Sequence, residues 1–184
     1  MASAFSHAIV AVAMGRSFQH KELGLRELLL GAFCSVVPDL DVFGFSFGIQ
    51  YGDLWGHRGL THSVLFAALL AGSLVVVWYR GRSAVAMAGL FFYFFLCTAS
   101  HGLLDAMTDG GLGVAFFSPF DTTRYFFPVR PILVSPIGVS EFFNAYGVQV
   151  LASEAAWIWL PSCAAFVVLR AIQRLWPVKS VASH

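Results

Sequence analysis

The sequence predicts an all-α membrane protein: a polytopic bundle of about five helices with one long aromatic loop at the membrane interface. Composition is the first observation, because 58% of the 184 residues are hydrophobic and only 11% are charged. A soluble chain of this length needs more polar surface to cover its core. The apolar residues also gather in long uncharged runs, and basic residues follow alternate runs. We therefore expect a single membrane-embedded helical domain over residues 1–184.

The first two apolar stretches, residues 4–15 and 23–37, are too short to span a bilayer comfortably. The second also begins with two charges, Arg26 and Glu27. We expect a helical pair that packs against the spans and crosses the membrane only in part. A cleaved signal peptide is disfavoured for the first stretch, because no basic residue precedes its apolar run.

Three membrane spans are expected after this pair. Residues 63–79 and 84–100 carry no charge, and each run would make about 25 Å of helix, near the lower limit for crossing the hydrocarbon core. Arg80 and Arg82 lie in the turn between them. Residues 151–169 form the third span.

The basic residues predict a topology. If five helices alternate in direction, eight of the eleven basic residues share one face of the membrane, and the positive-inside rule makes that face cytoplasmic. The amino terminus and the polar motifs described below then lie on the outer face, and the carboxyl terminus lies inside. The eight residues are Arg16, Lys21, Arg26, Arg80, Arg82, Arg170, Arg174 and Lys179.

The longest segment without a span is residues 106–150. Four prolines in it prevent a long helix, and the Phe and Tyr residues between them are types that settle at the headgroup level. We expect a loop on the outer interface, and a loop of this length is usually functional, for example as a lid. Arg124 and Arg130 lie in it and are candidates for holding an anionic headgroup.

Histidine and aspartate residues lie where the apolar runs end. Taken singly, each motif has an ordinary explanation: His101 and Asp105, four residues apart, can hydrogen-bond on one helix face, and aspartates commonly form turns. Gly59 predicts a turn, with Thr61 as N-cap of the following span. Taken jointly, groups that are costly to place against a membrane are better explained by one shared cation. The predicted ligands are His7, Asp39, His57, His62, His101 and Asp105.

Mixed nitrogen and oxygen ligands suit zinc, with iron and manganese as alternatives, and the number of candidate ligands leaves room for a second ion. We assign catalytic roles to Arg58 and Asp41. Arg58 lies between two predicted ligands, where a guanidinium can stabilise charge that develops on a substrate. Asp109 is expected to be a solvated loop carboxylate.

At these residues the sequence resembles the YdjM-like family of predicted membrane-bound, metal-dependent hydrolases of bacteria. His7, the PDLD motif, HRGLTHS and the later H-x-x-x-D pair occur in the order that the family requires. HRGLTHS is the specific part of the resemblance. A more distant similarity to zinc-dependent phospholipases C implies phosphoester hydrolysis by a multi-zinc site, although the further histidines of those enzymes have no counterpart here.

The sequence therefore predicts a metal-dependent hydrolase in the bacterial inner membrane that acts on a lipid or lipid-linked phosphoester at the outer face. The partners expected are membrane lipids, including an anionic substrate. No basic stripe suggests nucleic acid. A small transporter and a structural or interaction protein remain as alternatives. Polar residues near the midplane of interrupted helices would favour the transporter, and bound metal in purified protein would argue against the structural protein.

Overall fold

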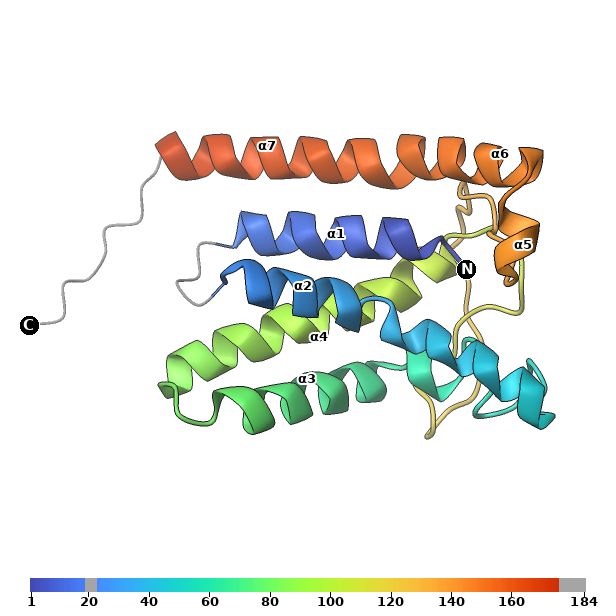
Figure 1. Ribbon diagram of the computed structural model, residues 1–184, viewed down its shortest axis with the longest axis horizontal. Helices are drawn as coiled ribbons and strands as arrows, with labels where there is room; N and C mark the ends of the chain where they lie inside the picture. Colours follow the sequence, from blue (N-terminus) through green and yellow to red (C-terminus); the bar gives the residue numbers. More distant parts are fainter. Residues whose placement is uncertain (19–22, 176–184) are drawn as a thin grey trace, which may run out of the picture.

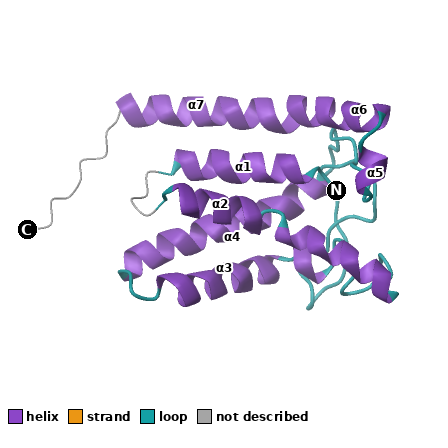
Figure 2. Ribbon diagram, in the orientation of Figure 1, coloured by secondary structure: helices purple, strands orange, loops and turns teal. Residues whose placement is uncertain are grey.

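The computed structural model describes residues 1–18 and 23–175, and all regular structure in those ranges is helical (Figure 1, Figure 2). No strand forms within them, although two isolated bridges join Thr108 to Ile132 and Val114 to Tyr125. Lys21 and Lys179, which we assigned to the cytoplasmic face, lie outside the described residues. The all-helical bundle predicted by composition is confirmed.

The bundle is organised around α1 and α4. Helix α1 packs against α2, α4 and α7, and α3 packs along α4 (Figure 1). Short helices α5 and α6 precede α7 at the end of the bundle where the chain begins. The bounds are α1 Ala4–Ser17, α2 Leu25–Cys34, α3 Val64–Tyr79, α4 Ala84–Ala106, α5 Val139–Phe142, α6 Ala145–Glu154 and α7 Leu160–Leu175.

The second apolar stretch is longer than expected. Helix α2 is followed by an 11-residue 3₁₀ helix, η1 (Val37–Phe47), and together they form a segment of 23 residues that is long and apolar enough to cross a membrane. We predicted 15 residues for this stretch. Helix α3 has 16 residues, close to the 17 of the predicted run, and is shorter than the candidate spans Ala84–Ala106 and Ala145–Leu175.

Pro38 explains why α2 stops where it does. A proline ring clashes with the carbonyl four residues earlier, and that residue is Cys34, the last of α2. Pro38 instead stands in the first turn of η1, where its missing N–H is not needed. Long 3₁₀ runs are uncommon. This one carries Asp39 and Asp41 into the interior and ends at Gly48, whose φ of 81° favours glycine.

The last long helix is also interrupted. A π-helical turn, η3 (Ala155–Trp159), joins α6 to α7, and such turns often occur at functional positions. It follows Glu154, a fully buried carboxylate that accepts hydrogen bonds from the backbone and hydroxyl of Ser3 and from the hydroxyl of Ser6. Trp159 donates to the same Ser6 hydroxyl. These bonds hold the start of α1 against the α6–α7 segment.

The apolar core lies between α1, α2, α3 and α4. Tyr93 and Phe94 of α4 are its largest fully buried side chains, and Tyr93 donates a hydrogen bond to the Ala11 carbonyl. Gly31 of α2 allows this approach, because a Cβ there would come within 2.2 Å of the Tyr93 hydroxyl. Cys34 and Cys97 are buried in the same core, whereas Cys163 is exposed on α7.

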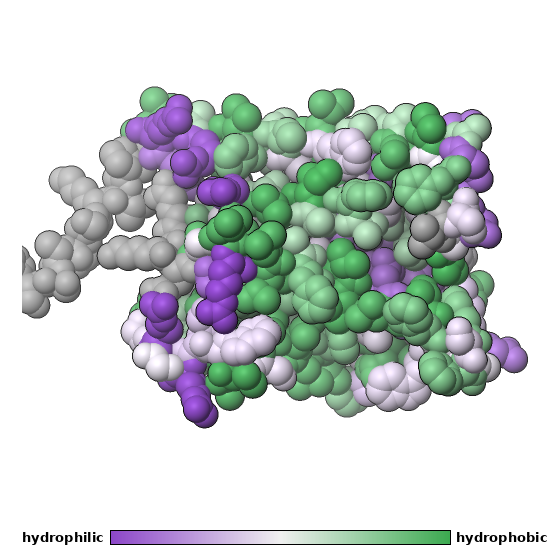
Figure 3. Space-filling view, viewed as in Figure 1, coloured by the Kyte–Doolittle hydropathy of each residue, from purple (hydrophilic) through white to green (hydrophobic). Residues whose placement is uncertain are grey.

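The two ends of the bundle differ in character. One end, called here the basic end, contains the end of α1, the start of α2, the α3–α4 turn and the end of α7, and hydrophilic residues gather there in Figure 3. Arg16, Arg26, Arg80 and Arg174 belong to these elements. The opposite end, called the site end, holds the start of α1, η1, the end of α4 and the loops between them.

Candidate metal centre

Four donor atoms from three separate segments meet at the site end. Asp39 comes from η1, His62 from a short 3₁₀ turn, η2 (Leu60–His62), and His101 and Asp105 from the last turns of α4. All four residues are buried, and His101 and Asp105 are fully inaccessible. The structure therefore brings four of the six predicted ligands into one group, called here the four-ligand group.

The two histidines of this group direct their Nε2 atoms at each other. The Nδ1 of His101 lies 2.7 Å from the Ser35 carbonyl, which can only accept, so Nδ1 carries a proton. The Nδ1 of His62 lies 3.2 Å from an Asp41 carboxylate oxygen in the same way. The two Nε2 atoms are 3.0 Å apart, so in the metal-free protein one of them donates a hydrogen bond to the other. A divalent cation would replace that proton and bond both lone pairs.

The spacing of the donor atoms fits a tetrahedral ion. Bonds of about 2.0–2.2 Å to zinc place neighbouring ligand atoms about 3.3–3.6 Å apart. The nitrogen pair is 3.0 Å apart, Asp39 Oδ1 lies 3.2 and 3.7 Å from the two nitrogens, and Asp105 Oδ2 lies 3.6 and 3.9 Å from them. Neither carboxylate oxygen of Asp39 has a hydrogen-bond partner, although both are buried. A divalent ion would satisfy all of these atoms.

The charge distribution also favours a cation. Burial by itself would lower the pKa of His62, but its contacts with Asp105, Asp39 and Asp41 outweigh burial and raise that pKa to about 10. In the absence of a metal the position therefore attracts a proton. Burial lowers the pKa of His57, against the effect of the neighbouring Asp41.

Asp41 supports the group rather than completing it. Its carboxylate lies 2.7 Å from His57 Nδ1 and 3.2 Å from His62 Nδ1, and it accepts hydrogen bonds from the Arg58 backbone and the Thr61 hydroxyl. A carboxylate behind a metal-ligating histidine fixes the tautomer and the orientation of the ring. Thr61 is thus not the N-cap that we expected. That role belongs to Ser63, whose hydroxyl accepts from the Phe66 backbone.

A second set of possible ligands, Asp41, His57 and His62, shares one histidine with the first. The Asp41–His57 contact of 2.7 Å has the length of a hydrogen bond and is shorter than the spacing of two ligands on one ion. His62 already directs its Nε2 into the four-ligand group. The geometry therefore favours one ion, with the buried Nε2 of His57 left without a hydrogen-bond partner.

His7 lies against the centre without joining the four-ligand group. Its ring stacks on that of His101, with 3.7 Å between centroids, and its Nε2 is 3.6 Å from Asp105 Oδ1. The side chain is fully buried, and neither ring nitrogen has a hydrogen-bond partner. An imidazole in this state retains donor capacity for a ligand that is bound at the centre.

Arg58 has protein partners where we expected substrate. Its guanidinium is fully buried and donates to Asp105 Oδ2 at 3.0 Å, to the Gly110 carbonyl and to the Thr108 hydroxyl. Its backbone has a φ of 63°, a left-handed conformation that is uncommon for a side chain of this size. In this structure Arg58 therefore holds Asp105 and the loop after α4, and its nitrogens do not face an open site.

The two loop arginines lie apart from the four-ligand group. Arg124 donates to the backbone carbonyls of His57 and Tyr51 and stacks over the Tyr51 ring, so it fastens the loop that carries the HRGLTHS motif. It also lines a small polar cavity of about 130 Å³. Arg130 stacks on Phe126 and is exposed. Asp109 is exposed, as expected, and accepts from the Val134 backbone.

Sequence reasoning missed several groups that hold the centre. The Ser35 carbonyl orients His101, and a backbone carbonyl leaves no signal in a sequence. Thr108 was overlooked because a lone threonine in a Gly-rich turn is ordinary, and only the fold shows it beside Arg58. The backbone N–H of Ala2 donates to Asp105 at 2.7 Å, a contact across 103 residues of chain.

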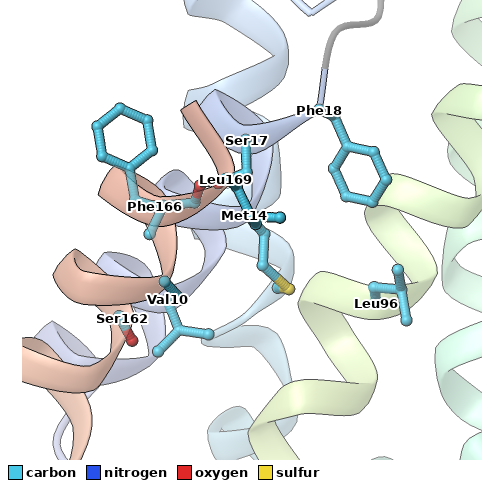
Figure 4. A pocket seen from close by; sticks show the side chains of 10 residues that line it. Val10, Met14, Ser17, Phe18, Leu96, Ser162, Phe166 and Leu169 are labelled. Atoms are coloured by element: carbon cyan, nitrogen blue, oxygen red, sulfur yellow. Dashed lines mark hydrogen bonds between the residues drawn. The ribbon is translucent and has the colours of Figure 1, made fainter. Parts of the chain in front are cut away.

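An apolar cavity lies away from the ligands. It has a volume of about 410 Å³ between α1, α4 and α7, and Figure 4 shows Val10, Met14 and Phe166 among the side chains around it. None of the predicted ligands lines this cavity. It opens on the apolar wall of the bundle.

Comparison with known proteins agrees with the motifs. The family model of YdjM inner membrane proteins matches residues 1–177. The chain is 37% identical to the inner membrane protein YbcI of Escherichia coli (strain K12) over 167 residues, which cover 88% of this chain and 92% of that protein. No solved structure matches. With its apolar helices and its buried His and Asp residues, the chain belongs to the YdjM family of inner membrane proteins.

Proposed function

We propose that the protein is a metal-dependent hydrolase that acts on a lipid or lipid-linked phosphoester at the outer face of the inner membrane. The observation that carries the proposal is the four-ligand group, in which two imidazole nitrogens 3.0 Å apart and an unpartnered carboxylate surround one position. Zinc suits this donor set of two nitrogens and two oxygens. A bound divalent ion would activate a water molecule and polarise a phosphoryl oxygen.

The residues around the four-ligand group support catalysis. His7 and His57 are buried at its edge, and each has at least one ring nitrogen without a partner. Asp41 holds His57 by its Nδ1, so the opposite nitrogen is free to bond a water molecule or a substrate oxygen. Arg58 keeps Asp105 in position. Arg124 remains our candidate for an anionic headgroup, because it is half-buried beside a polar cavity.

A structural metal site is the second candidate, and the burial of the four ligands favours it. Structural zinc sites have four protein ligands and no open position, whereas catalytic sites keep one position for water. An ion held by η1, η2 and α4 would then serve to tie these elements together. The unpartnered nitrogens of His7 and His57 argue for the hydrolase.

The experiment measures metal content, unfolding temperature and turnover of phospholipids and lipid-linked phosphates with the purified full-length protein. His62→Ala and Asp109→Ala form a matched pair, because both remove one polar side chain and only the first removes a ligand. We expect one equivalent of zinc and hydrolysis in the wild type and in Asp109→Ala, and loss of both in His62→Ala. Stoichiometric metal without turnover of any of these substrates would support the structural site instead. Protein that binds no divalent metal would overturn both candidates.

A further inference from the structure

The site end exposes a set of large aromatic side chains that the bundle does not need for its own packing. Three segments supply them: η1, the loop before η2, and the segment between α4 and α6 (Figure 1). Their exposed fractions run from 56% to 87%. This set, called here the aromatic collar, consists of Phe43, Phe47, Trp55, Phe117, Phe120 and Phe143.

Helix lengths indicate how deep the metal centre lies. The 14 residues of α1 and the 16 of α3 make about 21 and 24 Å of helix, whereas the hydrocarbon core is about 30 Å thick. Both helices end among arginines at the basic end, and arginines near helix ends reach for the membrane surface. At the other ends of these helices lie His7, in the first turn of α1, and His62, two residues before α3 begins. The centre then lies about 6–9 Å short of the far hydrocarbon boundary.

We infer that the aromatic collar is immersed in the outer leaflet and that the metal centre lies below the leaflet surface, so that its substrate comes sideways from the bilayer. The collar is continuous with the lipid-facing surface of a span, because Phe43 and Phe47 belong to the 23-residue segment Leu25–Phe47. Exposed charges stand among the aromatics, as Asp53 and Asp121 do. Aromatic rings mixed with charges are typical of the headgroup level.

The depth of the centre also narrows the class of substrate, and this conclusion rests on the proposed function. A compound that reaches a centre below the leaflet surface must carry an apolar tail, with the bond to be cleaved between that tail and a polar headgroup. A soluble ester of the same headgroup lacks the part that would bring it there. The partner of the collar itself is the lipid of the bilayer, whatever reaction the centre performs.

The test places a nitroxide spin label at single cysteines in full-length protein reconstituted into phosphatidylcholine and phosphatidylglycerol vesicles. Phe47→Cys and Phe120→Cys report on the collar, in a Cys163→Ser background where the remaining cysteines are buried. Leu69→Cys on α3 is the lipid-facing reference, and Arg80→Cys in the α3–α4 turn is the water-facing one; both positions are exposed. Oxygen concentrates in the bilayer and a charged nickel chelate stays in water, so their collision rates with the label report its depth.

We expect a several-fold excess of oxygen over nickel collisions at both collar positions, as at Leu69→Cys. Collision rates like those of Arg80→Cys would overturn the inference, because the collar would then face water. Low rates for both reagents would also overturn it, because a protein partner would then cover the collar. The result is independent of catalysis. If no lipid is hydrolysed, the proposed function fails, but the collision rates still decide whether the collar lies in the bilayer. In active protein, equal turnover of a phospholipid and its tail-less soluble phosphodiester would overturn sideways access.

Discussion

At the scale of single residues, the centre depends on which nitrogen of each histidine carries a proton. His101 donates a hydrogen bond from Nδ1 to a carbonyl, and His62 donates one from Nδ1 to Asp41. Each bond directs Nε2 at the same position, where carboxylates of Asp39 and Asp105 also converge. The sequence predicted these ligand types, but a tautomer depends on a partner that only folding brings near.

Arg58 provides the sharpest test at this scale. Removing one partner of a buried ion pair leaves the other charge unpaired, at a cost of about 3–5 kcal/mol. We therefore expect Arg58→Ala to lower the free energy of unfolding of metal-free protein by that amount. Arg58→Lys should lose less stability, because the positive charge remains and only the guanidinium hydrogen bonds to the Gly110 carbonyl and the Thr108 hydroxyl are lost. Denaturant unfolding in detergent measures both. An Arg58→Ala protein with wild-type stability and no hydrolysis would restore the substrate role that the sequence suggested.

Metal affinity should fall as the pH falls. The pKa of His62 in the metal-free protein is raised to about 10, so at neutral pH this histidine holds a proton that the metal must displace. One displaced proton lowers the apparent affinity up to about tenfold for each pH unit below that pKa. Competition with a chelator at about pH 6 and about pH 8 measures the affinity for zinc. We expect weaker affinity at the lower pH. Equal affinity at the two values would show that no proton is displaced.

At the scale of elements, the 3₁₀ helix η1 is the feature that assembles the centre. Pro38 ends α2 and starts η1, and the tighter winding places Asp39 at the four-ligand group and Asp41 behind His62. The sequence placed the PDLD motif at the end of the second helix and did not predict a further helical run there. Hydrophobic periodicity does not mark η1, because its buried residues are Pro38, Asp39 and Asp41, whereas Phe43 and Phe47 are exposed.

Asp41→Asn tests the supporting role of η1. The amide keeps the shape of the side chain but loses the charge that orients His57 and His62, and loss of such a supporting group costs about 10–100-fold in metal affinity or activity. We expect metal to be retained at weaker affinity, measured by chelator competition, whereas Asp39→Asn should lose the metal outright because it alters a ligand. If Asp41→Asn also abolished binding, Asp41 would be a ligand and the second set of residues would hold an ion of its own.

At the scale of the whole molecule, the basic residues and the metal centre lie at opposite ends of one bundle. Helices α1, α2, α3, α4 and the α6–α7 segment alternate in direction. This alternation brings the basic residues at the ends of α1, α3 and α7 together at the basic end. This arrangement agrees with the five-helix topology that the positive-inside rule predicts. On our inference, the shorter α1 and α3 leave the centre inside the thickness of the membrane.

The orientation is testable by reporters. We expect a reporter fused after His184 to be cytoplasmic and one inserted near Thr122, in the loop at the site end, to be external, because the arginines hold the basic end inside. An enzyme that is active only in the periplasm and a fluorescent protein that matures only in the cytoplasm measure the two positions. Both reporters on one side of the membrane would contradict the alternation of the five helices.

The sequence by itself determined the membrane class, the helical fold, the ligand types and the family, because composition and motif order are properties of the chain alone. It also placed His101 and Asp105 on one face of one helix, since a spacing of four residues is local geometry. Tertiary structure decided the rest. Arg58 is the partner of Asp105, His7 stacks on His101 and Asp41 lies behind His62, because each contact joins segments that are 21 to 94 residues apart. Such contacts follow from how helices pack, and that packing depends on the whole bundle at once.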